Sequence, residues 1–370
     1  MTTAIRKIAT GVALASAAAL LLAGCAPADN NGGNEGGDVQ KVTLQFNSYL
    51  GNSTPQAKSL IWYFEEVEKA SNGTIKIDQF WDGSLLDGPS SLAGVSDGRV
   101  DMVHVPTIYN PSELPLTQIT AMPFITGDVA ASGLTFQELY ETNDAFRAEW
   151  DKHNVHSLFF IGVAPSFVSA PEKVTNFDWL KGKTLRASGY IAEALQKAGG
   201  NAVGLPVVDV YEAIQRGTID GYTNMILDTV PVLSLQEVSP WIAETGLGLY
   251  TVNSLSFNKT KWDSLSEEHR KIFTDVASKW QDYYLKQLTE VEDTACQLLI
   301  DNGGGSTVWS DAEIKKWSDA LGSSALDKWR ADAQASGADV EAFYQTYIDT
   351  LRGHEGSYVN GITRCAELTK

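Results

Sequence analysis

The chain has 370 residues, of which 43% are hydrophobic, and it carries 46 acidic against 28 basic residues for a formal net charge of −18. This acidic balance argues against nucleic-acid binding, which needs clustered Lys and Arg, and against a polybasic contact with a membrane surface. The length supports one large domain or two medium ones, with ample apolar material for a core.

The first 24 residues have the features of a bacterial lipoprotein signal peptide. Arg6 and Lys7 give a short basic start, and residues 8–23 are apolar but too short and too rich in small residues to favour a stable membrane span. The run closes on Leu-Ala-Gly-Cys, the lipobox pattern, whose cysteine is Cys25. We therefore expect residues 1–24 to be removed and Cys25 to carry a lipid anchor. The alternative is an ordinary signal peptide with an incidental cysteine.

Residues 25–40 are rich in Gly, Asn and Asp. Such a segment cannot bury apolar area, so we expect a flexible tether. A tether behind a lipid anchor predicts a globular part that works outside the membrane and close to it.

The next part of the chain predicts a first α/β unit. In order, the pattern predicts a strand at 41–49, a helix from Thr54-Pro55 to about Asn72-Gly73, a strand at 75–81, a helix, and a third strand after the turn at Asp97-Gly98. This alternation is typical of a mostly parallel sheet with helices on its faces.

The same rhythm recurs in a second unit. Strands are predicted at 155–163, 183–188 and 201–207, with helices at 188–199 and from Asp209 to Gly217. The two units share no sequence repeat that would indicate internal duplication.

The pattern changes after Ser266. Apolar residues recur every three or four positions from Ile272 to Leu298, and neither Pro nor Gly appears from 266 to 302. A single helix of this length would span roughly 55 Å at about 1.5 Å per residue, more than the width of one small domain. We expect a rod that crosses both units, followed by more helix over 311–358.

Motifs for catalysis and metal binding are missing. The sequence has no His-Glu-x-x-His, Gly-x-Ser-x-Gly, Cys-x-x-Cys or Gly-x-Gly-x-x-Gly pattern. Gly182-Lys183-Thr184 resembles the end of a phosphate-binding loop, but Phe177 stands where that loop needs a glycine. His153 and His156 have no partner with metal-ligand spacing, so we expect surface histidines, no metal and no obligatory cofactor. Cys296 and Cys365 could form a disulfide in an exported protein or remain two free thiols.

The remaining features suit ligand binding. Two α/β lobes enclose a cleft, and ligands sit at strand ends in such sheets. Tyr49, Trp81 and Tyr109 each follow a predicted strand, and Arg186 stands where a strand hands over to a helix. Each aromatic taken alone is more typical of the core than of a ligand contact, but together, at strand ends, they indicate a binding cleft.

Several segments in order resemble one family. They include "FEEVEKASNGTIKIDQFWDGSLLDG", "DGRVDMVHVPTIY", "AMPF", "DWLKGKTLRAS", "GGNAVGLPVVDVYEAIQRGTIDGYTN" and "NSLSFNKTKWDSLSEEHRKIF". Over about residues 41–300, the chain resembles the solute-binding proteins of TRAP (tripartite ATP-independent) transporters, of the dicarboxylate-binding DctP type. The resemblance implies an α/β fold of the two-lobed, periplasmic-binding-protein-like type II class, with mixed sheets and a long helix spanning both lobes.

The resemblance also implies the site. Arg186 takes the position of the family's arginine, which forms a two-pronged salt bridge with a ligand carboxylate, a geometry that suits a planar guanidinium. Asn224, in Asp-Gly-x-x-Asn, would hydrogen-bond the carboxylate or a neighbouring hydroxyl, with Tyr222 beside it. Phe124 closes the "AMPF" segment and is a further expected ligand contact. Ser166 stands where many members have a second arginine or a polar group, so we expect it to contact the ligand without supplying a second charge clamp.

Three departures from the family pattern bear on the ligand: Ser166, Tyr222-Thr223 in place of the more usual Gln-Glu, and Leu247 where some relatives carry a ligand-touching histidine. They suggest a ligand with one carboxylate and an apolar or aromatic part. We expect a monomeric, non-enzymatic receptor that captures a small organic acid and delivers it to a TRAP permease. The expected ranges are 41–162 with 248–285 for lobe I and 163–247 with 286–370 for lobe II, hinged near 160–163, 248–258 and the long helix. A receptor for an ABC importer is the main alternative, and a surface-anchored hydrolase is a weaker one.

Overall fold

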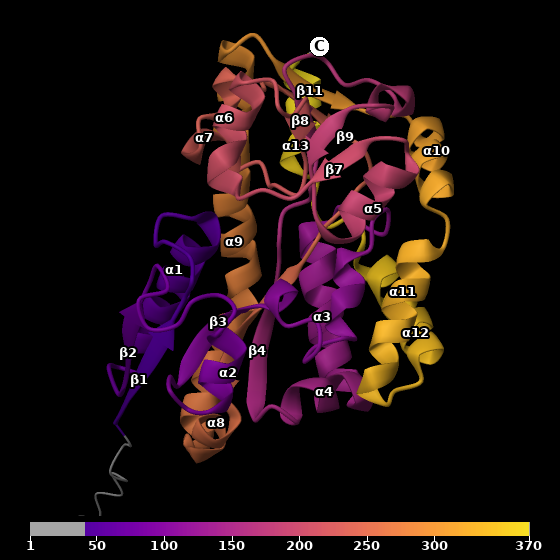
Figure 1. The fold of residues 1–370 in the computed structure, drawn as a ribbon. Helices are drawn as coiled ribbons and strands as arrows, with labels where there is room; N and C mark the ends of the chain where they lie inside the picture. The colour runs from indigo at the N-terminus through magenta and orange to yellow at the C-terminus, as the bar shows by residue number, and fades with distance from the viewer. Residues whose placement is uncertain (1–40, 370) are drawn as a thin grey trace, which may run out of the picture. The chain divides into compact units, whose positions relative to one another are not determined.

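The computed structural model describes residues 41–369, so the predicted signal peptide (1–24), Cys25 and the tether (25–40) lie outside it. The strands of this range form two sheets (Figure 1). The first sheet has the order β2-β1-β3-β10-β4, with β1 (Val42–Asn47), β2 (Ile75–Phe80), β3 (Met102–Pro106), β4 (Val155–Gly162) and β10 (Val252–Asn258). The second has the order β11-β9-β5-β8-β6-β7, with β5 (Val168–Ala170), β6 (Thr184–Arg186), β7 (Asn201–Val203), β8 (Gly221–Tyr222), β9 (Trp241–Glu244) and β11 (Gly305–Val308).

Helices cover these sheets. The α-helices are α1 (Pro55–Ala70), α2 (Ser91–Ser96), α3 (Val129–Thr142), α4 (Asp144–Asp151), α5 (Gly189–Lys197), α6 (Val210–Gln215), α7 (Thr229–Val232), α8 (Lys259–Ser264), α9 (Glu267–Asp301), α10 (Asp311–Leu321), α11 (Ser324–Ala333), α12 (Val340–His354) and α13 (Gly361–Leu368). Short 3-10 turns lie at Thr107–Tyr109, Thr117–Ala121, Phe177–Leu180, Val207–Asp209, Leu235–Glu237 and Gln334–Ser336.

Both sheets are mixed, which confirms the predicted fold class. In the first, β1 runs parallel to β2 and β3, while β10 is antiparallel to β3 and β4. In the second, β6 runs parallel to β7 and β8, while β5 is antiparallel to β8 and β9. The parallel strands are those joined by helices in sequence, as the α/β rhythm predicts. The antiparallel pairs, β10 with β3 and β4 and β5 with β8 and β9, do not follow this strand–helix–strand pattern.

The long helix predicted over 266–302 is confirmed as α9, which has 35 residues and is capped by the Ser266 side chain. It packs against α1 at one end and against α13 and β11 at the other (Figure 1). Trp280 and Leu288 belong to the core cluster of the first sheet, and Ala295 and Leu299 to a cluster beside the second. One continuous helix therefore contributes to the cores of both sheets.

The lobe boundaries stay a prediction, because the packing of the C-terminal part crosses between the sheets. α12 packs on α3, with Tyr347 against Phe136 at 5.5 Å between ring centroids, and its Phe343 lies 5.8 Å from Phe146 of α4. The largest core cluster also contains residues of β3 together with residues of β6 and β9.

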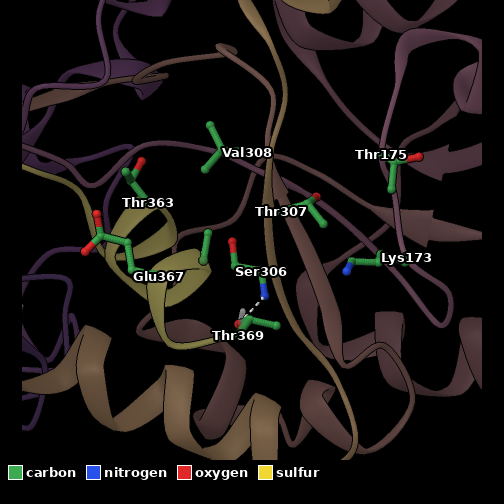
Figure 2. A pocket seen from close by; sticks show the side chains of 9 residues that line it. Lys173, Thr175, Ser306, Thr307, Val308, Thr363, Glu367 and Thr369 are labelled. Atoms are coloured by element: carbon green, nitrogen blue, oxygen red, sulfur yellow. Dashed lines mark hydrogen bonds between the residues drawn. The ribbon is translucent and has the colours of Figure 1, made fainter.

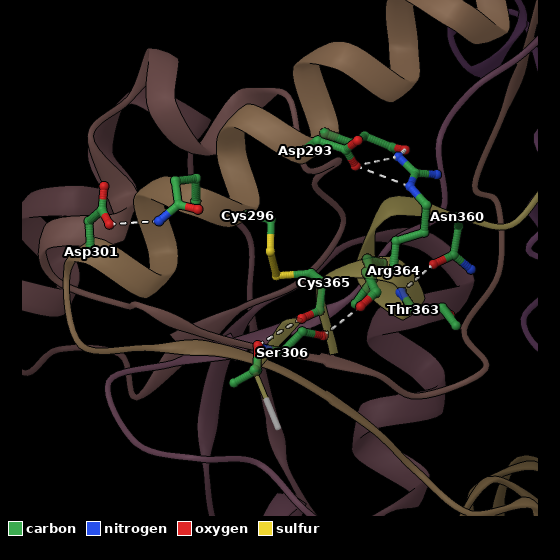
Figure 3. The surroundings of a disulfide bond; sticks show 12 residues. Asp293, Cys296, Asp301, Ser306, Asn360, Thr363, Arg364 and Cys365 are labelled. Carbon is green, nitrogen blue, oxygen red and sulfur yellow. Dashed lines mark hydrogen bonds and ion pairs between the residues drawn. A yellow bond between two sulfur atoms is a disulfide. The ribbon is translucent and has the colours of Figure 1, made fainter. Parts of the chain in front are cut away.

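A disulfide joins Cys296 of α9 to Cys365 of α13, with 5.4 Å between their Cα atoms (Figure 3). Of the two alternatives left by the sequence, the structure contains the bond. Beside it, Arg364 pairs with Asp293 at 3.0 Å and with the buried Glu292 at 3.1 Å. Covalent and ionic contacts thus hold the C-terminal helix on the long helix.

Replacing both cysteines tests the contribution of this link. We expect Cys296→Ser/Cys365→Ser to lower the free energy of unfolding by about 2–5 kcal/mol, because the crosslink restricts the unfolded chain across a separation of 69 residues. Urea denaturation followed by circular dichroism measures this. The reduced wild-type protein is the matched control and should unfold like the double variant. Equal stability of the oxidised wild type and the variant would contradict the assignment.

Candidate functional site

Arg186 ends β6 and is held by backbone carbonyls. Leu185 before it is buried, so the strand's alternation turns Arg186 to the opposite face, where it is half-buried. Its Nε donates to the carbonyl oxygen of Leu205 at 3.3 Å, and Nη1 donates to those of Thr223 at 3.1 Å and Asn224 at 2.8 Å. Three carbonyls from two loops therefore fix the plane of the guanidinium.

The outer edge of the same guanidinium has no partner within residues 41–369. Nη2 makes no hydrogen bond there, and no carboxylate of the described chain forms an ion pair with Arg186. Burial lowers the pKa of Arg186, but an arginine begins so far above neutrality that it stays charged. A half-buried cation without an anion is costly, and a ligand carboxylate at Nη2 would compensate it.

The Asp-Gly-x-x-Asn motif builds the loop that supports Arg186. The Asp220 carboxylate accepts the backbone N–H of Thr184 at 2.7 Å, which fixes the loop to the start of β6. A Cβ on Gly221 would lie 2.0 Å from the carbonyl oxygen of Ser169, so only glycine allows β8 to approach β5 this closely. Asn224 then adopts a left-handed conformation, with φ of 55°, which asparagine tolerates better than most residues.

Asn224 is held by its side chain and by its backbone. Its Oδ1 accepts the backbone N–H of Ser188 at 2.9 Å, and its own backbone N–H donates to Oγ of Ser166 at 2.9 Å. No hydrogen bond of its Nδ2 is found within residues 41–369, so this N–H₂ group is a second donor available near Arg186. Ser166 is fully buried and also bonds the Thr223 hydroxyl at 3.0 Å. Its hydroxyl therefore supports the loop instead of facing a ligand, contrary to our expectation.

Three of the aromatic residues expected at the ligand have partners in the core. Tyr222 is fully buried, with its ring 5.8 Å from that of Phe167, so the structure gives it no accessible surface for a ligand. The half-buried Trp81 packs edge-on against Phe46 at 5.3 Å. Phe124 is likewise half-buried, against Trp317. β8 lies inside its sheet between β5 and β6, which explains why Tyr222 is enclosed.

Tyr49 and Tyr109 do come together, and they do so with residues that the sequence did not single out. Their rings meet edge to face at 6.5 Å, and the Asn253 side-chain amide donates to the Tyr49 hydroxyl at 3.3 Å. Burial raises the pKa of Tyr250, with smaller electrostatic contributions from Asp228, Arg186 and Tyr109. Tyr250 just precedes β10, in a segment with no motif to mark it. The three tyrosines stand next to strands β1, β3 and β10 of the first sheet.

Asp228 is the second residue that sequence reasoning missed. It is half-buried, forms no ion pair within the described chain, and accepts the Thr229 hydroxyl at 3.3 Å, with the backbone N–H of Thr229 as a second donor. Burial raises its pKa to about 6. It interacts electrostatically with Tyr49 and Tyr250. Its position four residues after Asn224 was the only signal available in the sequence.

The loop between Asn224 and Asp228 passes from one sheet to the other. Met225 and Leu227 are buried in the cluster beside the second sheet, whereas Ile226 packs against the cluster of the first. Alternate side chains of one short segment thus reach both cores. Asn224, whose carbonyl binds Arg186, begins this short segment, and Asp228 ends it.

Two cavities lie away from Arg186. One, of about 440 Å³, lies between β11 and α13 and is lined by Ser306, Thr307, Thr363 and Lys173, among others (Figure 2). The other, of about 530 Å³, is lined by Gln118, Tyr190 and Lys328, among others. Neither includes Arg186. No group of three or more His, Cys, Asp and Glu side chains in residues 41–369 is arranged to hold a metal ion. Across the same range, no helix combines the length and apolar character needed to cross a bilayer.

A model of the DctP family, described as bacterial extracellular solute-binding protein family 7, matches residues 46–331. The chain belongs to this family. That membership confirms the resemblance to TRAP solute-binding proteins drawn from the motifs. It favours a TRAP receptor over a receptor for an ABC importer. The match covers the Arg186 strand, the Asp-Gly-x-x-Asn loop and all but the end of the α10–α11 region.

Characterised relatives share about a quarter of their residues with the chain. The ectoine-binding periplasmic protein TeaA of Halomonas elongata is 23% identical over 294 residues, covering 74% of this chain and 85% of TeaA. The 2,3-diketo-L-gulonate-binding periplasmic protein YiaO of Escherichia coli is 25% identical over 280 residues, covering 74% and 82%.

Solved structures show the same fold. A TRAP solute-binding protein of Desulfovibrio salexigens in an open form has a TM-score of 0.77 at 23% identity, covering 86% of this chain and 98% of that one. A marine metagenome TRAP protein specific for aromatic acids, in complex with metahydroxyphenylacetate, has a TM-score of 0.72 at 26% identity, covering 85% and 100%. The two-lobed solute-binding fold is therefore established for the chain.

The Ser166 hydroxyl offers a test of how the loop is held. We expect Ser166→Ala to lower the free energy of unfolding by about 1–3 kcal/mol, since the buried N–H of Asn224 loses its acceptor. Urea denaturation measures the loss, and Ser278→Ala on the exposed face of α9 is the matched control. An equal effect of the two substitutions would contradict this role for Ser166.

Proposed function

We propose that the protein is a lipid-anchored receptor that binds a small organic acid through Arg186 and delivers it to a TRAP permease. The observation that carries this proposal is the half-buried guanidinium whose Nη2 edge has no anionic partner within residues 41–369. The side-chain Nδ2 of Asn224 is a second donor on the adjacent loop. Together they suit a carboxylate, which accepts two charge-assisted hydrogen bonds.

The ligand body would contact the tyrosines. Tyr49 and Tyr109 meet edge to face, and Tyr250 precedes β10 of the same sheet. Aromatic rings offer large apolar area with a polar hydroxyl, which suits an acid with an apolar or aromatic part. Similar proteins support this size and chemistry: other TRAP solute-binding structures contain benzoate or mandelate.

Binding would close the two lobes around the ligand. The crossing segments are the end of β4, the start of β10 and α9, and these are the proposed hinge. A ligand shifts such an equilibrium only by its preferential affinity for the closed form. A carboxylate between Arg186 and the tyrosines of the other sheet would supply that preference. The role requires no bond to be made or broken in the ligand, so we propose a receptor and not an enzyme.

The permease and the membrane anchor complete the proposal. The family consists of extracellular solute-binding proteins, which supports a position outside the cytoplasmic membrane. Lipidated Cys25 would keep a monomeric receptor near the permease, on a tether formed by residues 25–40.

Arg186 provides the direct test of the binding mode. We expect Arg186→Ala to weaken carboxylate binding by about 2–3 kcal/mol, or about 30- to 150-fold, because the ligand anion loses its charged partner. Isothermal titration with benzoate and with any acid that co-purifies in native mass spectrometry measures the change. Arg216→Ala, which removes an exposed arginine paired with Glu212, is the matched control. Unchanged affinity in Arg186→Ala would show that the acid is held elsewhere.

The anchor is tested separately. We expect Cys25→Ser to move the protein from the membrane fraction to the soluble extracytoplasmic fraction, because a serine hydroxyl cannot take the thioether-linked lipid. Fractionation followed by intact-mass measurement checks this. A wild-type protein without a lipid mass increment would contradict the anchor but leave ligand binding unaffected.

A further inference from the structure

The chain passes between the two sheets once more after α12, through residues 356–360, which we term the strap. Before the strap, α12 packs on α3, and α3 covers β4 of the first sheet. After the strap, α13 packs on β9 and β11 of the second sheet. The match to the family model ends at residue 331, so the strap and the helices on either side of it lie beyond the matched region.

One buried carboxylate fixes the strap to the first sheet. Oδ2 of Asp128 accepts three successive backbone N–H groups, those of Gly356 at 3.0 Å, Ser357 at 2.9 Å and Tyr358 at 3.2 Å. Its Oδ1 accepts the N–H of Ala131 at 2.9 Å, in the first turn of α3. Hydrogen bonds to an ionised carboxylate are stronger than those between neutral groups. Asp128 therefore holds the start of the strap on the start of α3.

The other end of the strap is the beginning of α13. Oδ1 of Asn360 accepts the N–H of Thr363 at 2.9 Å and so caps α13 (Figure 3). Its Nδ2 donates to Oε2 of Glu244 at 3.1 Å, at the end of β9. Further along α13, Cys365 is bonded to α9. Asn360 is therefore fixed to the second sheet by its side chain and by the helix that it caps.

The strap passes next to the segments that would bend as the sheets close on a ligand. The Thr126 carbonyl, just before α3, accepts the N–H of Leu249, just before β10, at 3.0 Å. The Gly248 carbonyl accepts the N–H of Ser166, which follows β4, at 2.9 Å. The two carboxylates that hold the strap belong to these same segments, each only a few residues from one of these bonds. The strap therefore ties together the two sides of the proposed hinge.

The strap is short enough to restrain this hinge. Tyr358 is held on the first-sheet side, and its hydroxyl also donates to the buried Glu292 of α9 at 2.5 Å. Asn360 is held on the second-sheet side, so only Val359 stands between the two attachments. The two chain steps from Tyr358 to Asn360 span at most about 7 Å when fully extended. A larger separation of the attachments requires the hydrogen bonds at one end of the strap to break.

We propose that the strap limits how far the two sheets swing apart in the unliganded protein. Asp128 is the positioning residue of this device, because it gathers three N–H groups and so shortens the free chain between α12 and α13. A hinge with a restricted open range loses less conformational freedom when a ligand closes it, which favours binding. This inference goes beyond the proposed function, and its test needs no ligand.

Lengthening the strap tests the restraint. Inserting Gly-Ser after Val359 leaves the Asp128 bonds and the α13 cap in place and adds about 7 Å of reach. Spin labels on exposed positions of α1 and α5, at Lys58→Cys and Lys197→Cys in a Cys25→Ser chain, report the separation of the sheets. Double electron–electron resonance measures the spread of label-to-label distances. We expect the insertion to widen this spread about 1.5-fold or more in the unliganded protein, because a longer strap allows wider opening.

Two matched controls accompany this variant. The same insertion after Gly337, in the exposed joint between α11 and α12, should leave the spread unchanged. Asp128→Ser keeps a good cap for α3 but has no second oxygen for the strap, so it should also widen the spread. Asp339→Ser, at the cap of α12, is the control for that substitution. A melting curve checks that each variant is folded, and Asp128→Ser decides the question if the insertion after Val359 does not fold.

The distances separate a restraint from simple stabilisation. An unchanged spread in the lengthened strap, even with a lower melting temperature, would show that residues 356–360 only stabilise the fold, and the inference would be wrong. A narrower spread would also overturn it, since the strap would then hold the sheets apart. Neither result bears on carboxylate binding, which Arg186→Ala tests independently.

Discussion

The binding site depends on one guanidinium that the protein fixes but does not neutralise. Arg186 donates to the carbonyls of Leu205, Thr223 and Asn224, so its orientation is set before any ligand arrives. These neutral acceptors hold the plane without cancelling the charge, which an aspartate or glutamate in their place would do. The unpaired Nη2 edge is therefore a preorganised anion site. The unfavourable free energy of this unpaired, half-buried charge is offset by the stability of the rest of the fold.

The loops around Arg186 hold the guanidinium, and with it the Nη2 edge, in place. Asp220 fixes the loop to β6, Gly221 lets two strands approach closely, and Ser166 accepts the Asn224 N–H from a buried position. The motif is thus more structural than its sequence suggests: most of its polar atoms bind the protein itself. In the motif and the Arg186 side chain, Asn224 Nδ2 and Arg186 Nη2 have no hydrogen-bond partner among the described residues and are free to donate to a ligand.

The long helix and its covalent link set the larger frame. α9 contributes side chains to the cores beside both sheets, and the disulfide and the Arg364 ion pairs hold α13 on it. A rod shared by two sheets limits how they can move relative to each other, and bending near it is the motion left for closure around a ligand. In this way the same helix that stabilises the fold also restricts the motion on which binding depends.

The sequence by itself determined the fold class, the long helix and the position of Arg186. Helix periodicity without Pro or Gly is a local property, and so is the helix start at Thr54-Pro55, where the structure shows the Thr54 side chain as the cap. The motif order identified the family because those residues build tight turns that tolerate few alternatives. Sequence patterns failed where a residue's role depends on packing partners far away in the chain. Tyr222 and Ser166 looked like ligand contacts, but the inner position of β8 and the fold of its loop bury them. Asp228 and Tyr250 carry no motif, and only the tertiary structure shows that both are partly withdrawn from water, because burial is decided by neighbours in space and not by neighbours in sequence.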